Sequence, residues 1–198
     1  MDSSPNIVVY GWAFAPPTIW HHAVVQAILE KMNIEKFLIV PSGPRADKSY
    51  TIEKETRRKI IEVFASEFDD PRVMVDFTFL ESCTNTTTLA MDRYYQKLFG
   101  QSPFQVFGAD VANCMADWPN TLKNREYILR KMPKIFLTRH DIELDLEWKS
   151  SYRLIDADIP NASSTAVRED GRLDLLTEGV RTVYQDLVLD KKIFYLYK

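Results

Sequence analysis

The stretch that decides the fold is Asn6-Ile7-Val8-Val9-Tyr10, followed directly by Gly11-Trp12-Ala13-Phe14-Ala15-Pro16-Pro17-Thr18-Ile19-Trp20-His21. Its first part is short, apolar and rich in β-branched residues, which is typical of a buried strand. A proline-containing loop follows. A helical face then repeats at the expected spacing, made by Val25, Ile28, Leu29 and Met32. A strand, a loop and a helix in this order predict a place where free backbone N–H groups can hold a phosphate.

The same alternation continues along the chain. Further strands are predicted at 37–40, 73–77, 104–107 and 135–138, and amphipathic helices at 61–68, 91–98 and 180–187. Short apolar strands between helices predict an α/β fold, a Rossmann-like open parallel sheet with helices on both faces. We expect one domain over 1–198, because no repeat or linker divides the chain, with a C-terminal helical segment at roughly 160–198.

Ligands of such sheets bind beyond the carboxyl ends of the strands. Thr18 and His21 follow the first predicted strand, and residues 41–48 follow the second. Asp110 follows the fourth strand and Arg139 the fifth. All of these residues are therefore expected to gather on one rim of the sheet.

Composition excludes several classes of protein. The formal net charge of −3 disfavours a nucleic-acid-binding surface, although a local cationic pocket remains compatible with it. No apolar run approaches the ~20 residues of a membrane span, and Asp2 takes the place of a basic signal-peptide start. Cys83 and Cys114 lie in unrelated contexts, so free thiols and a cytoplasmic location are expected. With only three histidines and no Cys/His cluster, no protein-bound metal is expected.

A second informative stretch is Ser163-Ser164-Thr165-Ala166-Val167-Arg168. Hydroxyl groups at a helix start cap the free N–H groups, and they can also donate to phosphate oxygens. The fork of an arginine suits a polyphosphate. The same string is equally compatible with an ordinary helix start followed by an exposed arginine. Similarly, the His21-His22 pair is compatible with a surface histidine pair after a proline-rich loop.

Both stretches resemble signatures of the HxGH nucleotidyltransferase superfamily. The first is similar to G-G-x-F-D-P-x-H-x-G-H, and the matching positions are Gly11, Phe14, Pro16 and His21. The positions that depart from this signature are Trp12, Ala15, Thr18 and Trp20. The second stretch resembles the I-S-S-T-x-I-R element and is nearly intact.

A third match narrows the family. Gly108-Ala109-Asp110 followed by Trp118 is similar to the G-A-D…W pattern of nicotinate-mononucleotide adenylyltransferases. Further positions resemble loops of that family: Pro41-Ser42-Gly43, Lys48, the segment Cys83 to Leu89 with Thr84 and Asn85, and Arg139. The resemblance runs from about residue 6 to residue 197.

This resemblance implies adenylyl transfer from ATP to nicotinate or nicotinamide mononucleotide, which gives the dinucleotide and pyrophosphate in NAD biosynthesis. Magnesium is implied with ATP. Implied catalytic residues are His21, Arg168 and Thr18, the last standing in place of the first signature histidine. Implied ATP-binding residues are Gly11, Phe14, Ser163, Ser164, Thr165, Asp110 and Arg139. Implied substrate-binding residues are Trp118, which stacks on the pyridine ring, and Lys48, Thr84 and Asn85.

Alternatives remain at this point. One is another phosphorylated acceptor such as phosphopantetheine, and another is a non-catalytic nucleotide-binding module, because half of the first signature is replaced. We also expect Arg57, Arg58 and Lys59 to form a solvated helix start. The sequence indicates no oligomeric state.

Overall fold

The structure is a computed structural model, and it describes residues 6–44, 52–82, 85–119, 121–138, 142–145, 147 and 149–189. Its centre is a six-stranded sheet with the order β3-β2-β1-β4-β5-β6. Every neighbouring pair of strands is parallel. The strands are β1 (Ile7–Trp12), β2 (Lys36–Pro41), β3 (Val73–Val75), β4 (Phe104–Gly108), β5 (Lys134–Leu137) and β6 (Tyr152–Ile155). The predicted Rossmann-like parallel sheet is therefore confirmed.

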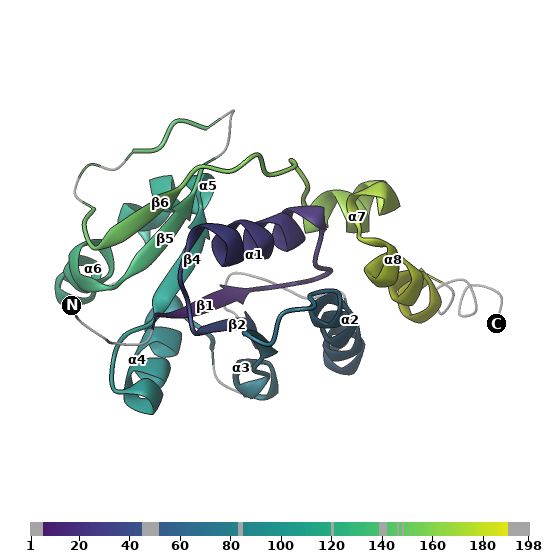
Figure 1. The fold of residues 1–198 in the computed structure, drawn as a ribbon, viewed down its shortest axis with the longest axis horizontal. Coiled ribbons are helices and arrows are strands. Elements are labelled where there is room, and N and C mark those ends of the chain that lie inside the picture. The colour runs from purple at the N-terminus through teal and green to yellow at the C-terminus, as the bar shows by residue number, and fades with distance from the viewer. Residues whose placement is uncertain are drawn as a thin grey trace.

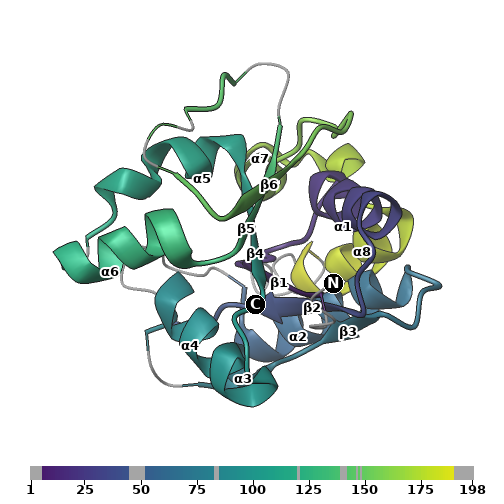
Figure 2. The same cartoon turned by 60° about the vertical axis from the view of Figure 1, so that its left-hand side comes forward.

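Helices cover both faces of this sheet. They are α1 (Ile19–Lys31), α2 (Lys54–Ser66), α3 (Thr78–Glu81), α4 (Thr88–Phe99), α5 (Ala109–Cys114), α6 (Leu122–Glu126), α7 (Ser164–Asp170) and α8 (Glu178–Tyr184). Figure 2 shows α4, α5 and α6 on one side of the sheet and α1 and α8 on the other.

The core follows from strand alternation, since successive side chains point to opposite faces. Val8 and Tyr10 of β1 belong to the large cluster that contains the apolar faces of α1, α2 and α8. Ile7 and Val9 of the same strand pack in a separate cluster with residues of α3 and α4. Both sides of the sheet are thus buried, as a continuous apolar strand predicts.

Helix ends follow local chemistry. The Thr87 hydroxyl accepts from the Ala90 N–H at the start of α4, and Gly100 ends that helix with a φ of 73°. The predicted start of α7 is confirmed as well, since the Ser163 hydroxyl accepts from the Ala166 N–H. No helix in the described part of the chain is long and apolar enough to cross a membrane.

The strand predictions need two corrections. The third strand ends at Val75, two residues early, because the Asp76 carboxylate turns the chain by accepting the Thr78 N–H. The edge strand β6 was not predicted. It is short and mostly exposed, and it carries Arg153, so it lacks the apolar run of an interior strand.

Strand order reverses between β1 and β4, which lie side by side although β2 and β3 come between them in sequence. In doubly wound sheets the ligand crevice lies at the carboxyl ends of the strands at such a switch point. Figure 1 shows α7 beside the start of α1, so the segment that follows β6 returns to this edge of the sheet.

Candidate active site

The loop between β1 and α1 is where the two sequence motifs meet. Arg168 in α7 donates from Nη1 to the carbonyl oxygen of Ala15 at 2.6 Å. Ser164 donates from its hydroxyl to the carbonyl oxygen of Pro16 at 2.7 Å. These contacts join residues that are 153 and 148 positions apart in sequence. The two motifs, whose residues the resemblance assigns to one ATP site, therefore meet at this edge of the sheet.

His21 is held by the residue that caps its own helix. Its Nδ1 lies 2.9 Å from the Thr18 hydroxyl and 3.0 Å from the Thr18 backbone nitrogen. Because Nδ1 accepts the backbone N–H, the proton of a neutral ring is assigned to Nε2, which makes Nε2 a hydrogen-bond donor. Both side chains are buried. Thr18 therefore fixes both the orientation and the tautomer of His21.

Aromatic rings surround that imidazole. The centroids of Phe14 and Trp20 each lie 5.2 Å from the centroid of His21, and those of Tyr10 and Trp12 lie at 6.1 and 6.4 Å. Trp20 is only 3% exposed and belongs to the main core cluster. Trp12 is the one ring of these four that is partly exposed. The tryptophans that replace two glycines of the signature therefore pack beside the histidine.

Phe14 gives this loop its shape. It is fully buried and has a φ of 47°, in the left-handed region that residues other than glycine rarely adopt. Its ring packs edge-on against Tyr10 at 5.2 Å. The aromatic side chain thus anchors the loop in the core while the backbone turns above it.

The end of β4 supplies the other wall of the switch point. A Cβ at Gly108 would lie 2.7 Å from Oδ1 of Asp110 and 3.2 Å from the ring of Trp20, so glycine allows this close approach. Asp110 is exposed in the first turn of α5. Trp118 is half-buried and meets the ring of Phe107 edge-on at 6.0 Å. Both predicted ligand contacts therefore follow β4, as expected.

The loop after β2 is tied to the segment before α4. Gly43 donates its N–H to the Thr86 hydroxyl at 3.1 Å, and Thr86 donates its N–H to the carbonyl of Pro44 at 2.8 Å. A Cβ at Gly43 would lie 2.0 Å from the carbonyl oxygen of Phe79, so only glycine fits. Asn85, a predicted substrate contact, is exposed beside Thr86. The predicted residues Lys48, Thr84 and Arg139 lie outside the described residues, as does Cys83.

Arg57 is the residue that the sequence interpretation missed. Predicted to be solvated, it is only 3% exposed, and its Nη2 donates to the carbonyl oxygens of Ala13 at 2.6 Å and Ser42 at 2.8 Å. The spacing could have indicated its burial. Arg57, Ile60, Ile61 and Phe64 stand at i, i+3, i+4 and i+7, which places all four on the buried face of α2.

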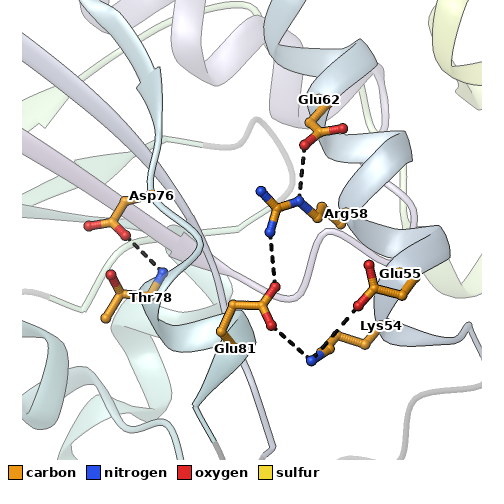
Figure 3. A network of polar contacts seen from close by, with 7 residues as sticks. All are labelled: Lys54, Glu55, Arg58, Glu62, Asp76, Thr78 and Glu81. Carbon is orange, nitrogen blue, oxygen red and sulfur yellow. Dashed lines mark hydrogen bonds and ion pairs between the residues drawn. The ribbon is translucent and has the colours of Figure 1, made fainter.

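Arg58 behaves as predicted. It lies on the outside of α2, where it contacts Glu62 and Glu81 at 3.1 Å each, and Lys54 contacts the same Glu81 at 2.8 Å (Figure 3). Hydrogen bonds from Lys54 and Arg58 lower the pKa of Glu81. This network joins α2 to α3 at the surface, and Lys59 is exposed beside it.

No group of three or more His, Cys, Asp or Glu side chains in the described ranges is placed to hold a metal ion.

No protein-family model matches the chain. Curated relatives do match it along nearly its whole length. A probable nicotinate-nucleotide adenylyltransferase of Sulfurovum sp. is 22% identical over 192 residues, which cover 96% of this chain and 98% of that protein. A protein of the same name from Acholeplasma laidlawii is 27% identical, with 95% and 97% covered.

The chain is similar, along most of its length, to proteins named probable nicotinate-nucleotide adenylyltransferase. A third protein of this name, from Fusobacterium nucleatum, is 27% identical and covers 82% of the chain, and 86% of its own length is matched. The fold agrees. The Plasmodium falciparum nicotinic acid mononucleotide adenylyltransferase complexed with NaAD matches with a TM-score of 0.74 at 19% identity, over 92% of this chain and 95% of that one. The resemblance to this family that the sequence motifs indicate is confirmed.

Proposed function

We propose that this protein transfers the adenylyl group of ATP to nicotinate mononucleotide, giving nicotinate adenine dinucleotide and pyrophosphate in NAD biosynthesis. The observation that carries this proposal is the contact of Arg168 and Ser164 with the loop after β1. It joins the two motifs that resemble the superfamily's phosphate-binding elements, in a chain whose curated relatives carry this name. The solved relative from Plasmodium falciparum is complexed with NaAD, the product of this reaction.

The chemistry needs no covalent enzyme intermediate. The 5′-phosphate of the mononucleotide attacks the α-phosphorus of ATP in line, the bond from this phosphorus to the bridging oxygen of the β-phosphate breaks, and pyrophosphate leaves with the electron pair. The protein must hold two anions together and neutralise charge on the leaving group. Magnesium arrives with ATP as part of the substrate.

Arg168 is assigned to the β- and γ-phosphates, with help from the hydroxyls of Ser163 and Thr165. Ser164 supports the loop instead, because its one hydroxyl proton is donated to Pro16. A guanidinium has five N–H groups. The described contacts use one N–H toward Ala15 and one toward Thr165, which lies at 3.3 Å, so further N–H groups remain for a phosphate. Arg168 can therefore support the loop and bind the nucleotide at the same time.

His21 is assigned to the same phosphates through its Nε2 donor. Thr18 acts on the reaction through His21, because both of its polar groups at this point are directed to Nδ1. Because His21 is buried among aromatic rings, this assignment requires that some of the surrounding side chains shift when a phosphate approaches. The sequence suggested an accessible His21, whereas in this proposal His21 becomes accessible only when the ligand binds.

The remaining assignments follow the strand ends. Asp110 is proposed to bind the adenosine, and Trp118 to stack on the pyridine ring, where stacking on an aromatic is worth ~1–3 kcal/mol. Gly11, Phe14 and Arg139 are assigned to the ATP side. Lys48, Thr84 and Asn85 are assigned to the mononucleotide side.

The test is incubation of the protein with ATP, magnesium and either nicotinate or nicotinamide mononucleotide, with detection of the dinucleotide and pyrophosphate. Formation of the nicotinate dinucleotide in preference to the amide supports the proposal. Binding of ATP without any product from either acceptor contradicts it. Turnover with phosphopantetheine alone assigns the same chemistry to another acceptor.

A further inference from the structure

Two loops of the candidate site are joined by one buried arginine. Arg57 lies in the first turns of α2, and a single nitrogen of its guanidinium donates to Ala13 just after β1 and to Ser42 just after β2. The Ser42 N–H also donates to the carbonyl of Trp12 at 2.8 Å. The loop after β1 faces the proposed triphosphate, and Gly43 in the loop after β2 contacts Thr86, the neighbour of the proposed mononucleotide contact Asn85.

Burial of this cation requires a physical reason. Moving a charged group out of water is expensive unless it is hydrogen-bonded, and a guanidinium at 3% exposure has lost nearly all contact with solvent. Methionine or leucine at this position would continue the apolar face of α2 at no such expense. The guanidinium supplies instead a donor that can hold two carbonyl oxygens from different loops at once.

The contact with Ala13 also fixes the peptide that follows it. In a trans peptide the N–H points away from the C=O, and the peptide between Ala13 and Phe14 is trans. Holding the Ala13 carbonyl toward α2 therefore turns the Phe14 N–H away from α2. On the far side of the same loop, Arg168 and Ser164 hold the carbonyls of Ala15 and Pro16.

We propose that Arg57 is a positioning residue that fixes the loop after β1 relative to the loop after β2, so that the two substrates meet at reacting distance. The proposal rests on the proposed function for its catalytic consequence. It does not rest on it for the loop geometry, which can be measured without any nucleotide.

The expected kinetic signature is a loss of rate rather than of affinity. In Arg57→Gln each loop still binds its own substrate, so the Kd of ATP alone and of the mononucleotide alone change little. Misplacement of the reacting groups should lower kcat on the order of 10²-fold. Arg57→Lys keeps a donor and a charge, and should recover much of that loss. Arg58→Gln is the matched control, and it should leave kcat within about twofold because its side chain faces solvent.

Hydrogen–deuterium exchange on the nucleotide-free protein provides the second measurement. Peptides that cover residues 10–17 and 40–44 should exchange faster in Arg57→Gln than in the wild type. Their exchange rates should be unchanged in Arg58→Gln. Faster exchange in both peptides supports the link between the loops even if the wild type shows no adenylyl transfer. The proposal for Arg57 can therefore hold although the proposed function fails. Unchanged exchange, or a kcat that stays at the wild-type value in an active protein, overturns the assignment. Should Arg57→Gln not fold, Arg57→Met, which keeps the apolar part of the side chain but has no donor, takes its place with the same expected results.

Discussion

Among the residues that the structure describes, buried cations hold backbone carbonyls in two regions, which lie at opposite ends of the parallel sheet. At the carboxyl end, Arg57 and Arg168 hold carbonyls of the loops beside the switch point. At the amino end, Lys134 begins β5 with no exposure and donates to the carbonyls of Ile128 and Met132 at 2.8 and 2.6 Å.

The same device has different consequences at the two ends. Lys134 closes the π-helical segment Tyr127–Lys131, beside a buried Asp92 that accepts the Tyr127 hydroxyl at 2.7 Å. Nothing in this region follows the carboxyl end of a strand. Burial of a charge therefore does not by itself mark a reaction site. The direction of the strands decides which end of the sheet meets the substrate.

The largest expected effect is that of Arg168→Ala on turnover. Loss of one well-placed donor to a transition-state anion lowers rate on the order of 10²–10³-fold. We expect only a small change in the free energy of unfolding, because the Arg168 side chain is only partly buried. Steady-state kinetics and urea unfolding of the same preparation check this, with Arg172→Ala, an exposed partner of Asp174, as control. Equal loss of activity in both variants would contradict the assignment.

Lys134→Met should show the opposite pattern. Removing the ammonium leaves two buried carbonyls without their donor, at about 1–3 kcal/mol of unfolding free energy. The kcat of the folded protein should stay at the wild-type value, because the residue lies at the far end of the sheet. Denaturant midpoints and kcat measured side by side provide the check. A fall in kcat without loss of stability would remove the contrast between the two ends.

The pH dependence of stability sharpens the same comparison. Burial lowers the pKa of Lys134 to about 8, well below its value in an unfolded chain. Between these two pKa values the unfolded state binds more protons, so stability rises as pH rises above about 8. The slope for one such group approaches ~1.4 kcal/mol per pH unit. The rise should be absent in Lys134→Met, which unfolding curves between neutral and alkaline pH will measure.

The smallest effect is expected for Ser164→Ala. It removes the hydrogen bond to Pro16, worth about 0.5–1.5 kcal/mol. We expect a moderate rise in the KM for ATP because the loop loses one support while Arg168 keeps another. Ser164→Thr, which retains the hydroxyl, is the control. A KM for ATP that is unchanged in Ser164→Ala would show that Arg168 and Arg57 order this loop without Ser164.

Sequence alone predicted most of the fold, because five strands are short apolar runs and α1, α2, α4 and α8 have clear apolar faces. It did not predict the short helices α3, α5 and α6. It missed β6, whose exposed edge position removes the need for apolar residues on both faces. The resemblance of both stretches to phosphate-binding elements implied that Gly11–His21 and Ser163–Arg168 serve one ATP site, and the structure brings them into contact.

The internal geometry of the site was not predictable in the same way. Nothing in the string of residues shows that Thr18 binds His21, or that Trp12 and Trp20 fill the space beside it. These contacts depend on how rings pack in three dimensions. Arg57 was misjudged because its charge was weighed above its place in the helical repeat of buried positions.

The bonds from Arg168 and Ser164 to the first loop join positions 153 and 148 residues apart, which affects how the protein is made. During translation, β1 through β6 leave the ribosome before Arg168 does, so strands can pair while the candidate site is still incomplete. Closing so long a stretch of chain is slow compared with forming neighbouring strands. Competence to react should therefore arrive last in biosynthesis, because Ser164 and Arg168 are made only after all six strands.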